Sequence, residues 1–262
     1  MSDSLSALIK AVETADSAAA LTDAVEALAN ANCLESAPIL IEALSYNNPG
    51  AAVAAVDGLV RLGQRVVPSL LEQIDQNNYT ARSWAIRALA GIGDPRGLVT
   101  LLGVATADFS MSVRRAAARG LGNMQWHLFP PKLLEVAQAE VLDALLFVAR
   151  HDEEWVVRYA AVVGLECLGL AAQRINSLGY NEIQRLFDSM AMHEESVSVR
   201  ARARKAQLSL ERPIVFHGDQ STHAYQVLTS MDWEQILEKL YARKVKEREL
   251  SFEEDLACYQ QV

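Results

Sequence analysis

The sequence is poor in cysteine and in aromatic residues. Its three cysteines, Cys33, Cys167 and Cys258, lie far apart in a chain of 262 residues. Their odd number and wide spacing exclude a disulfide framework and a zinc-ligand motif, so a reducing compartment is the simplest interpretation. Because aromatic residues make up only 6% of the chain, each of them is a candidate for a specific role.

Two further absences limit the class of protein. No apolar run approaches the roughly 18 residues that indicate a transmembrane helix, and Met1–Ser4 lacks the basic flank and apolar core of a signal peptide. The formal net charge of -9 disfavours general nucleic-acid binding, which needs a positive field to displace counterions. We therefore expect a cytoplasmic protein with no membrane span and no nucleic-acid partner.

The sequence also lacks a recognisable catalytic or metal-binding motif. Neither a phosphate-binding loop nor a Gly-x-Ser-x-Gly nucleophile motif is present. The five histidines are scattered, and none stands at metal-ligand spacing from a cysteine or an acid. We predict no metal site and no cofactor, and we expect Cys33 and Cys167 to be inert small apolar residues.

What the chain does contain is a repeated pattern of about ten residues. The copy Ala81–Ala90 recurs in altered form at 113–122, 157–165 and 199–206, and residues 51–59 fit the same frame. Taking Arg82 as the anchor, the equivalent positions are 52, 82, 114, 158 and 200, at steps of 30, 32, 44 and 42. Repeats of this length predict stacked helical hairpins with a long binding surface, not one closed globule.

We therefore predict an all-α fold over residues 1–210, namely an α–α superhelix (a HEAT-like or armadillo-type solenoid) of about five to six helical hairpins. Residues 126–131 are interpreted as an insertion that accounts for the 44-residue step, followed by a helix at 141–149. Residues 211–262 form a C-terminal extension with one amphipathic helix at about 232–248. That helix could cap the open end of the stack or dock on a partner, and capping is slightly favoured.

One face of the second helix carries arginine in two adjacent hairpins. Positions one and five after the anchor lie four apart, so they share a face. Arg87, Arg115 and Arg119 occupy these positions in adjacent repeats. A basic strip on an acidic protein suits an anionic ligand or an acidic partner surface.

The anchor arginines have a separate, structural interpretation. An acid precedes three of them by six positions, giving the pairs Asp108 and Arg114, Asp152 and Arg158, and Glu194 and Arg200. This spacing suits a ladder of charge-assisted hydrogen bonds between repeats. Arg82 has Gln76 at the matching place, so its partner is not evident.

The rare aromatic residues lie near the basic strip in the repeat pattern. Tyr79 enters the second helix, Trp84 takes a position that alanine holds elsewhere, and Trp126 belongs to the insertion. Aromatic faces and guanidinium forks together suit a flat conjugated ligand that carries carboxylates. Asp57 or Asp108 could then accept hydrogen bonds from ring N–H groups, which is one interpretation among several.

Four runs give a more specific indication. Residues 45–59, 79–96, 108–122 and 155–165 closely resemble the HEAT-like phycobilin lyases, in particular the F-type subunits of the E/F phycocyanobilin lyases. The resemblance spans roughly residues 5–210. It implies a heterodimer with an E-type subunit that binds phycocyanobilin and attaches it through a thioether to a cysteine of the phycocyanin α subunit, in phycobilisome biogenesis.

In such a complex the bilin is a substrate and the acceptor thiol belongs to the other protein, which fits the absence of an evident nucleophile here. Isomerising members of the wider family carry a His-Cys pair, and no such dipeptide occurs in this chain. The resemblance therefore implies simple attachment. The alternative is a non-enzymatic HEAT-repeat adaptor or bilin carrier in phycobilisome assembly or degradation.

Overall fold

The computed structural model describes residues 2–74, 78–172, 177–211 and 233–245. The chain divides into two compact units, Met1–Thr222 and His223–Val262. Within the second unit, the described residues 233–245 are helical and fall inside the helix that we expected at 232–248; positions 232 and 246–248 of that expectation lie outside the described residues.

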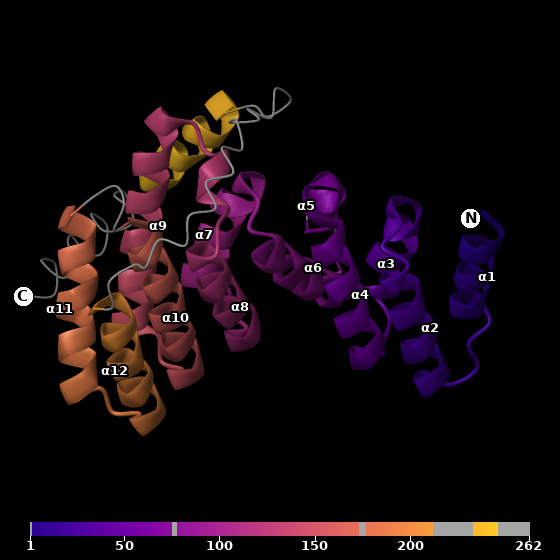
Figure 1. Ribbon diagram of the computed structural model, residues 1–262, viewed down its shortest axis with the longest axis horizontal. Helices are drawn as coiled ribbons and strands as arrows, with labels where there is room; N and C mark the ends of the chain where they lie inside the picture. Colours follow the sequence, from indigo (N-terminus) through magenta and orange to yellow (C-terminus); the bar gives the residue numbers. More distant parts are fainter. Residues whose placement is uncertain (1, 75–77, 173–176, 212–232, 246–262) are drawn as a thin grey trace, which may run out of the picture. The chain divides into compact units, whose positions relative to one another are not determined.

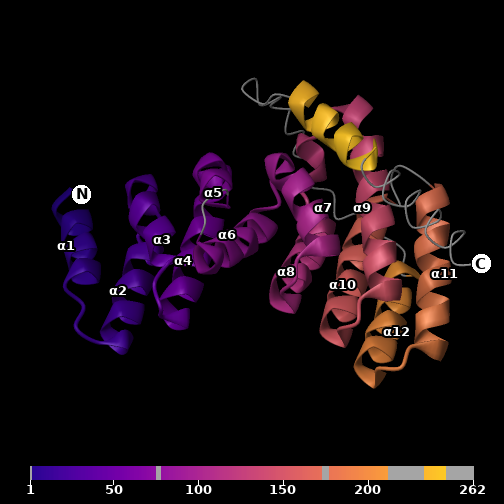
Figure 2. The same cartoon turned by 180° about the vertical axis from the view of Figure 1, so that it is seen from behind.

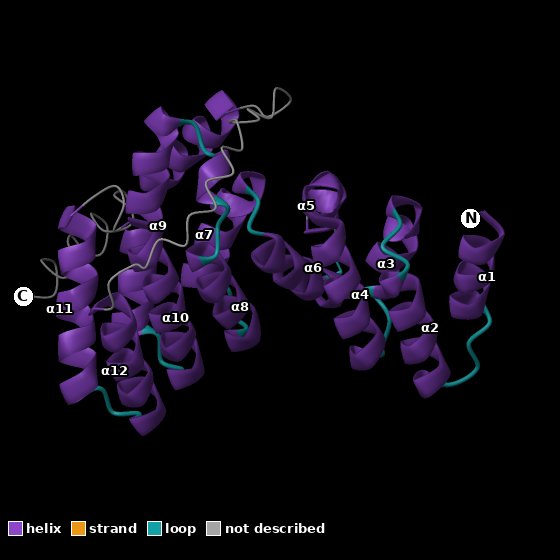
Figure 3. Ribbon diagram, viewed as in Figure 1, coloured by secondary structure: helices purple, strands orange, loops and turns teal. Residues whose placement is uncertain are grey.

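The first unit is built from six α-helical hairpins, and no strand occurs among the described residues (Figures 1 and 3). The hairpins are α1 (Ser2–Glu13) with α2 (Ala18–Asn30), α3 (Ala37–Ala43) with α4 (Pro49–Leu62), α5 (Val67–Ile74) with α6 (Tyr79–Ile92), α7 (Leu98–Ala107) with α8 (Met111–Gly122), α9 (Pro131–His151) with α10 (Trp155–Ala172), and α11 (Ser177–His193) with α12 (Val197–Glu211). Four short 3-10 helices join them: η1 (Leu34–Ser36), η2 (Gly63–Val66), η3 (Pro95–Gly97) and η4 (Trp126–Leu128).

The second helices of the hairpins form one continuous row. In sequence order α2, α4, α6, α8, α10 and α12 each pack on the next, and each also packs on the first helix of its own hairpin. The opposite view in Figure 2 shows the same order of helices. This arrangement is the all-α solenoid that the repeat spacing predicts.

Local sequence signals place the helix ends. Asn48 and Asn78 are the N-caps of α4 and α6, and their side chains accept hydrogen bonds from Ala51 N (3.2 Å) and Ala81 N (3.1 Å). Gly93 follows α6 with a positive φ of 68°, a left-handed conformation that favours glycine. Asparagine before and glycine after the helix therefore set the ends of α4 and α6.

Small residues let the second helices approach closely. A Cβ built on Gly122 would overlap the backbone of Gly164 in α10, and one built on Gly164 would lie 2.5 Å from the carbonyl oxygen of Ala118. A Cβ on Gly120 would likewise overlap the backbone of Ala90 in α6. The high alanine and glycine content of these helices is therefore what permits the spacing between α6, α8 and α10.

Three ion pairs connect successive repeats along the turns between first and second helices. We call this series the arginine ladder. It consists of Arg82 with Asp108 (2.7 Å), Arg114 with Asp152 (2.7 Å) and Arg158 with Glu194 (2.6 Å). A ladder between repeats is present, as the acid-to-arginine spacing predicts, but each carboxylate pairs with the arginine of the preceding repeat and not with the one six positions later. Asp108 is therefore the partner of Arg82.

Each acid in the ladder contacts two arginines in different ways. The carboxylate of Asp152 accepts hydrogen bonds from Arg114 of the preceding repeat, whereas the backbone carbonyl of Asp152 accepts one from Arg158 of its own repeat (2.8 Å). Arg200 follows the second half of this pattern and donates to the carbonyls of Glu194 (2.5 Å) and Glu195 (3.0 Å). Each turn is thus held by an arginine of the preceding repeat and by an arginine of its own repeat.

We expect Arg114→Ala to lower the free energy of unfolding by about 2–3 kcal/mol, because it leaves the nearly buried carboxylate of Asp152 without its charged partner. The matched control is Arg200→Ala. Among the described residues Arg200 bonds to two carbonyls and to no carboxylate, so its loss should cost only about 1 kcal/mol. Urea denaturation of both variants measures the difference, and equal losses would contradict this role for the ion pair.

One predicted element is wrong in its extent. Helix α9 begins at Pro131 and runs for 21 residues, whereas we expected a helix only at 141–149. Pro131 occupies the first turn, where its missing N–H costs nothing. The 44-residue step therefore reflects a lengthened first helix, together with the short 3-10 helix η4 at Trp126–Leu128, and not an irregular insertion alone.

Candidate functional site

The row of second helices carries a hollow of about 830 Å³, which we call the basic pocket. Helices α4, α6, α8 and α10 line it, with Ser198 from α12. The lining includes Asp57, Arg87, Arg115, Arg119, Trp155, Tyr159 and Cys167. Its volume is within the usual range for small-molecule sites, about 300–1,000 Å³.

The three arginines that the repeat phase places on one face all line this pocket. Arg87, Arg115 and Arg119 are exposed, and within the described residues none makes a hydrogen bond or ion pair. Partial desolvation and the positive charge of Arg115 lower the pKa of Arg87, and Asp57 acts in the opposite direction. The pocket therefore holds cationic groups that repel one another and are available to an anionic ligand.

Arg87 also has an aromatic neighbour. Its guanidinium carbon lies 4.6 Å from the centroid of the Trp84 ring, which is cation–π geometry. Trp84 does not itself line the pocket. The tryptophan at a position that alanine holds in other repeats therefore supports the guanidinium group of Arg87.

The α10 end of the basic pocket carries aromatic residues and a thiol. Tyr159 lines the pocket, and the guanidinium carbon of Arg202 lies 6.0 Å from its ring centroid. Arg202 is buried and forms an ion pair with Glu166, the residue before Cys167. Sequence reasoning did not assign Trp155, Tyr159 or Cys167 to the site. The signal was available for Tyr159, because it occupies the same repeat position as Arg115.

The thiol of Cys167 is expected to react slowly. Burial and the neighbouring charge of Glu166 raise its pKa, although Arg202 and Arg119 act in the opposite direction. The thiolate fraction at pH 8 is then smaller than that of an ordinary cysteine, and alkylation should continue to accelerate as the pH rises above the usual thiol pKa. Iodoacetamide labelling in a Cys33→Ser, Cys258→Ser background, read by mass spectrometry across pH, measures this. A labelling rate that levels off below pH 8 would contradict it.

The structure separates the other predicted site residues from the basic pocket. Tyr79 and Asp108 line a different hollow, with Arg82 and Phe109. Asp108 is buried in its ion pair with Arg82, so its carboxylate is already engaged. Trp126 lies in η4 with its ring centroid 5.4 Å from that of Phe129, and it does not line the basic pocket. Of the eight predicted residues, the pocket brings together Asp57 and the three arginines.

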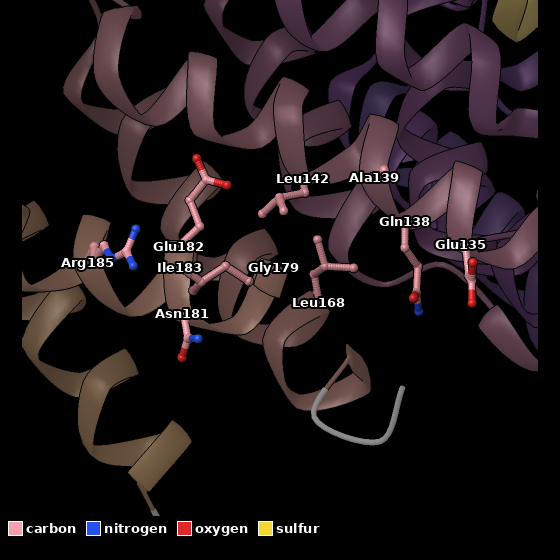
Figure 4. A pocket seen from close by; sticks show the side chains of 10 residues that line it. All are labelled: Glu135, Gln138, Ala139, Leu142, Leu168, Gly179, Asn181, Glu182, Ile183 and Arg185. Carbon is pink, nitrogen blue, oxygen red and sulfur yellow. The ribbon is translucent and has the colours of Figure 1, made fainter. Parts of the chain in front are cut away.

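Another cavity, of about 370 Å³, lies between α9 and α11 (Figure 4). Leu142, Leu168 and Ile183 form its apolar part, and Glu182 is among its polar residues. The amide nitrogen of Gln138 is buried and has no hydrogen-bond partner in the described part of the chain. The cavity mixes acidic, basic and apolar groups, so its chemistry does not select one class of ligand.

Comparison with known proteins agrees with the fold. A family model described as HEAT repeats matches residues 67–166. The packed hairpins and this match define the chain as a HEAT-type α-solenoid. Among the residues that the structure describes, no group of histidine, cysteine and acidic residues could hold a metal, and no helix is long and apolar enough to cross a membrane.

Curated relatives are more specific. A phycocyanobilin lyase subunit beta of Pseudanabaena tenuis is 57% identical over 95% of this chain and 92% of its own length. A phycocyanin alpha phycocyanobilin lyase CpcF of Synechocystis is 54% identical over 63% of this chain and 77% of its own. The solved complex of CpcE and CpcF of phycocyanin lyase from Nostoc contains a chain with 44% identity and a TM-score of 0.60, covering 67% of this chain and 99% of that one. The chain belongs to the family of phycocyanobilin lyase β subunits, and the resemblance seen in the sequence is confirmed.

Proposed function

We propose that this chain is the β (F-type) subunit of a phycocyanobilin lyase, which acts with an E-type partner to attach the bilin to a cysteine of the phycocyanin α subunit in the cytoplasm during phycobilisome biogenesis. The relatives support this proposal, because they are phycocyanobilin lyase subunits and one solved relative is a complex of E-type and F-type subunits. A curated relative from Synechococcus elongatus, 45% identical over 78% of this chain, is a phycobilisome maturation protein.

The observation that carries the proposal is the convergence on one hollow of three guanidinium groups that form no ion pair within the described residues, in a chain of net charge -9. An open-chain tetrapyrrole is flat, conjugated and anionic through its propionates. Arg87, Arg115 and Arg119 supply the guanidinium forks that hold carboxylates. Asp57 is placed to accept a pyrrole N–H, and Tyr159 offers an aromatic face to the conjugated system.

The reaction needs little chemistry from this chain. A thioether forms when the acceptor thiol adds across a double bond of the bilin, so that sulfur bonds to carbon and the thiol proton ends on the bilin. No oxidant, leaving group or cofactor is required, and the bilin is a substrate. The pocket residues hold the bilin in position and limit its motion, which lowers the entropic part of the barrier.

The test is bilin transfer to apo-phycocyanin α subunit with the E-type partner present. A covalent product keeps its colour on the protein after denaturation in acid and urea, whereas a carried bilin separates. No covalent adduct above a control without lyase would reject the proposal. Bilin binding without covalent transfer would support the alternative of a carrier or adaptor.

A further inference from the structure

Exposed apolar side chains gather along one border of the solenoid, at the turns that join first and second helices. We call this border the turn edge, and Figure 3 shows the α9–α10 and α11–α12 turns side by side on it. Phe109 is 79% exposed and Met192 75% exposed. Among the described residues from 79 to 197, the exposed large apolar residues other than Tyr159 all lie here: Tyr79, Phe109, Met111, Phe147, Trp155, Met192 and Val197.

The arginine ladder holds these side chains outward. Arg114 donates to the backbone carbonyls of Asp108 (2.9 Å) and Phe109 (3.2 Å), so the backbone of the turn faces inward and the Phe109 ring faces solvent. That ring stacks on Tyr79, with centroids 4.6 Å apart. An aromatic pair fixed in this way loses little conformational entropy when it binds a partner.

The next turn repeats the arrangement. Arg158 donates to the carbonyls of Asp152 (2.8 Å) and Glu153 (3.0 Å), and Phe147 packs against His151 with ring centroids 4.9 Å apart. Two hollows of about 450 and 320 Å³ adjoin these pairs, the first lined by Tyr79 and Phe109 and the second by Phe147 and His151, and Asp108 lines both. The turn edge therefore offers both protruding rings and recesses for the side chains of another protein.

The turn edge carries exposed carboxylates beside its apolar side chains, together with the exposed guanidinium of Arg150 at the end of α9. Glu153, Glu154 and Glu195 are exposed, and none forms an ion pair within the described residues. The ladder acids beneath them are neutralised by arginine. An apolar border with exposed, unpaired carboxylates suits a protein surface that presents lysine or arginine among apolar groups.

The turn edge reaches the basic pocket at Trp155. This residue begins α10 directly after Glu154, is 46% exposed, and also lines the basic pocket. A protein docked along the turn edge therefore lies beside the part of the basic pocket that Trp155 lines. In a transfer reaction the acceptor has to present its thiol to a pigment held in that pocket, and the turn edge is an apolar surface that adjoins the pocket at Trp155.

The geometry points to the turn edge as the docking surface for the acceptor biliprotein subunit, with Phe109 and Phe147 as its aromatic anchors. This inference rests on the proposed function of the basic pocket and assigns a second, separate surface to the protein substrate.

The experiment compares Phe109→Ser, Phe147→Ser with Leu208→Ser in the complete complex with the E-type partner. Leu208 is 53% exposed on α12 and lies outside the turn edge, so the control removes a similar exposed side chain. We expect the double substitution to raise the KM for apo-phycocyanin α subunit at least about tenfold, because it removes two exposed aromatic anchors. The kcat, the affinity for phycocyanobilin and co-elution with the E-type partner should stay as in the unsubstituted complex and in the control.

A photo-crosslinking amino acid at position 109, compared with position 208, gives a second readout. Crosslinking of position 109 to the acceptor supports the inference. An unchanged KM, or crosslinking to the E-type partner with loss of co-elution, overturns it. If the unsubstituted complex transfers no bilin, the proposed function fails, and crosslinking at 109 still decides whether the acceptor docks on the turn edge.

Discussion

The substitution Gly122→Ala is expected to lower the free energy of unfolding by at least about 3 kcal/mol, which is the upper part of the range for overpacking. The added methyl group would overlap the backbone of Gly164, and a backbone cannot rotate away as a side chain can. Helices α8 and α10 would have to separate, and the repeats on either side would lose their shared core. Thermal and urea denaturation measure the loss.

Gly103→Ala is the matched control for that experiment. Gly103 lies inside α7, and a Cβ built there meets nothing within 4 Å. Alanine should therefore raise stability by about 0.5–1 kcal/mol through its higher helix propensity. Equal stabilities for the two variants would show that α8 and α10 are not in close backbone contact.

The second large effect concerns ligand affinity. We expect Arg87→Ala, Arg115→Ala to weaken phycocyanobilin binding about a hundredfold, because a charge-assisted hydrogen bond contributes about 1.5 kcal/mol or more. The affinity of the Arg87→Lys, Arg115→Lys variant should lie between that of the unsubstituted complex and that of the alanine variant, because lysine keeps the charge but lacks the planar guanidinium group. Absorbance titration of the complex with bilin measures the affinities.

Arg150→Ala is the control, because Arg150 is an exposed arginine outside the basic pocket. The stability of the unliganded double variant provides a further check. Arg115 and partial burial disfavour the charge of Arg87, so removing both groups should leave stability unchanged or slightly higher. Equal weakening by Arg150→Ala would show that net charge, and not the pocket, determines binding.

Most helices can be predicted from the sequence because residues at their ends form local caps and turns. Asn48, Asn78 and Gly93 act locally, through caps and a left-handed turn, so their effect does not depend on distant contacts. The pair Pro130–Pro131 misled the prediction for the opposite reason. Proline both ends and begins helices, and the choice at α9 depends on packing that a sequence does not show.

The arginine ladder was predictable in composition and not in connectivity. A spacing of six between Asp152 and Arg158 indicates that the two are neighbours, and their contact does exist. It uses the backbone carbonyl, while the carboxylate of Asp152 binds Arg114 from the preceding repeat. Contacts between residues 38 positions apart depend on how repeats stack, which one copy of the repeat does not encode.

The candidate site was half predictable. Repeat phase places Arg87, Arg115 and Arg119 on one helical face, and all three line the basic pocket. Repeat phase does not indicate where residues in the turns point. Tyr79 and Asp108 were therefore predicted to belong to the same site as the arginines, whereas they line a different hollow. Turns between helices project past the face that periodicity defines, and their direction is set by the hydrogen bonds that hold them.

The arginine ladder also has a mechanical consequence. Between Arg82 and Glu194, each turn that joins a first helix to a second helix is bonded both to the preceding repeat and to its own second helix. This border of the solenoid therefore resists stretching. Bending of that segment has to open the opposite border. At position 52, which is equivalent to Arg82, the repeat carries alanine, and alanine has no guanidinium group to form such an ion pair. Flexing that accommodates a pigment or a partner should therefore concentrate between α4 and α6, where hydrogen exchange of amides would be fastest.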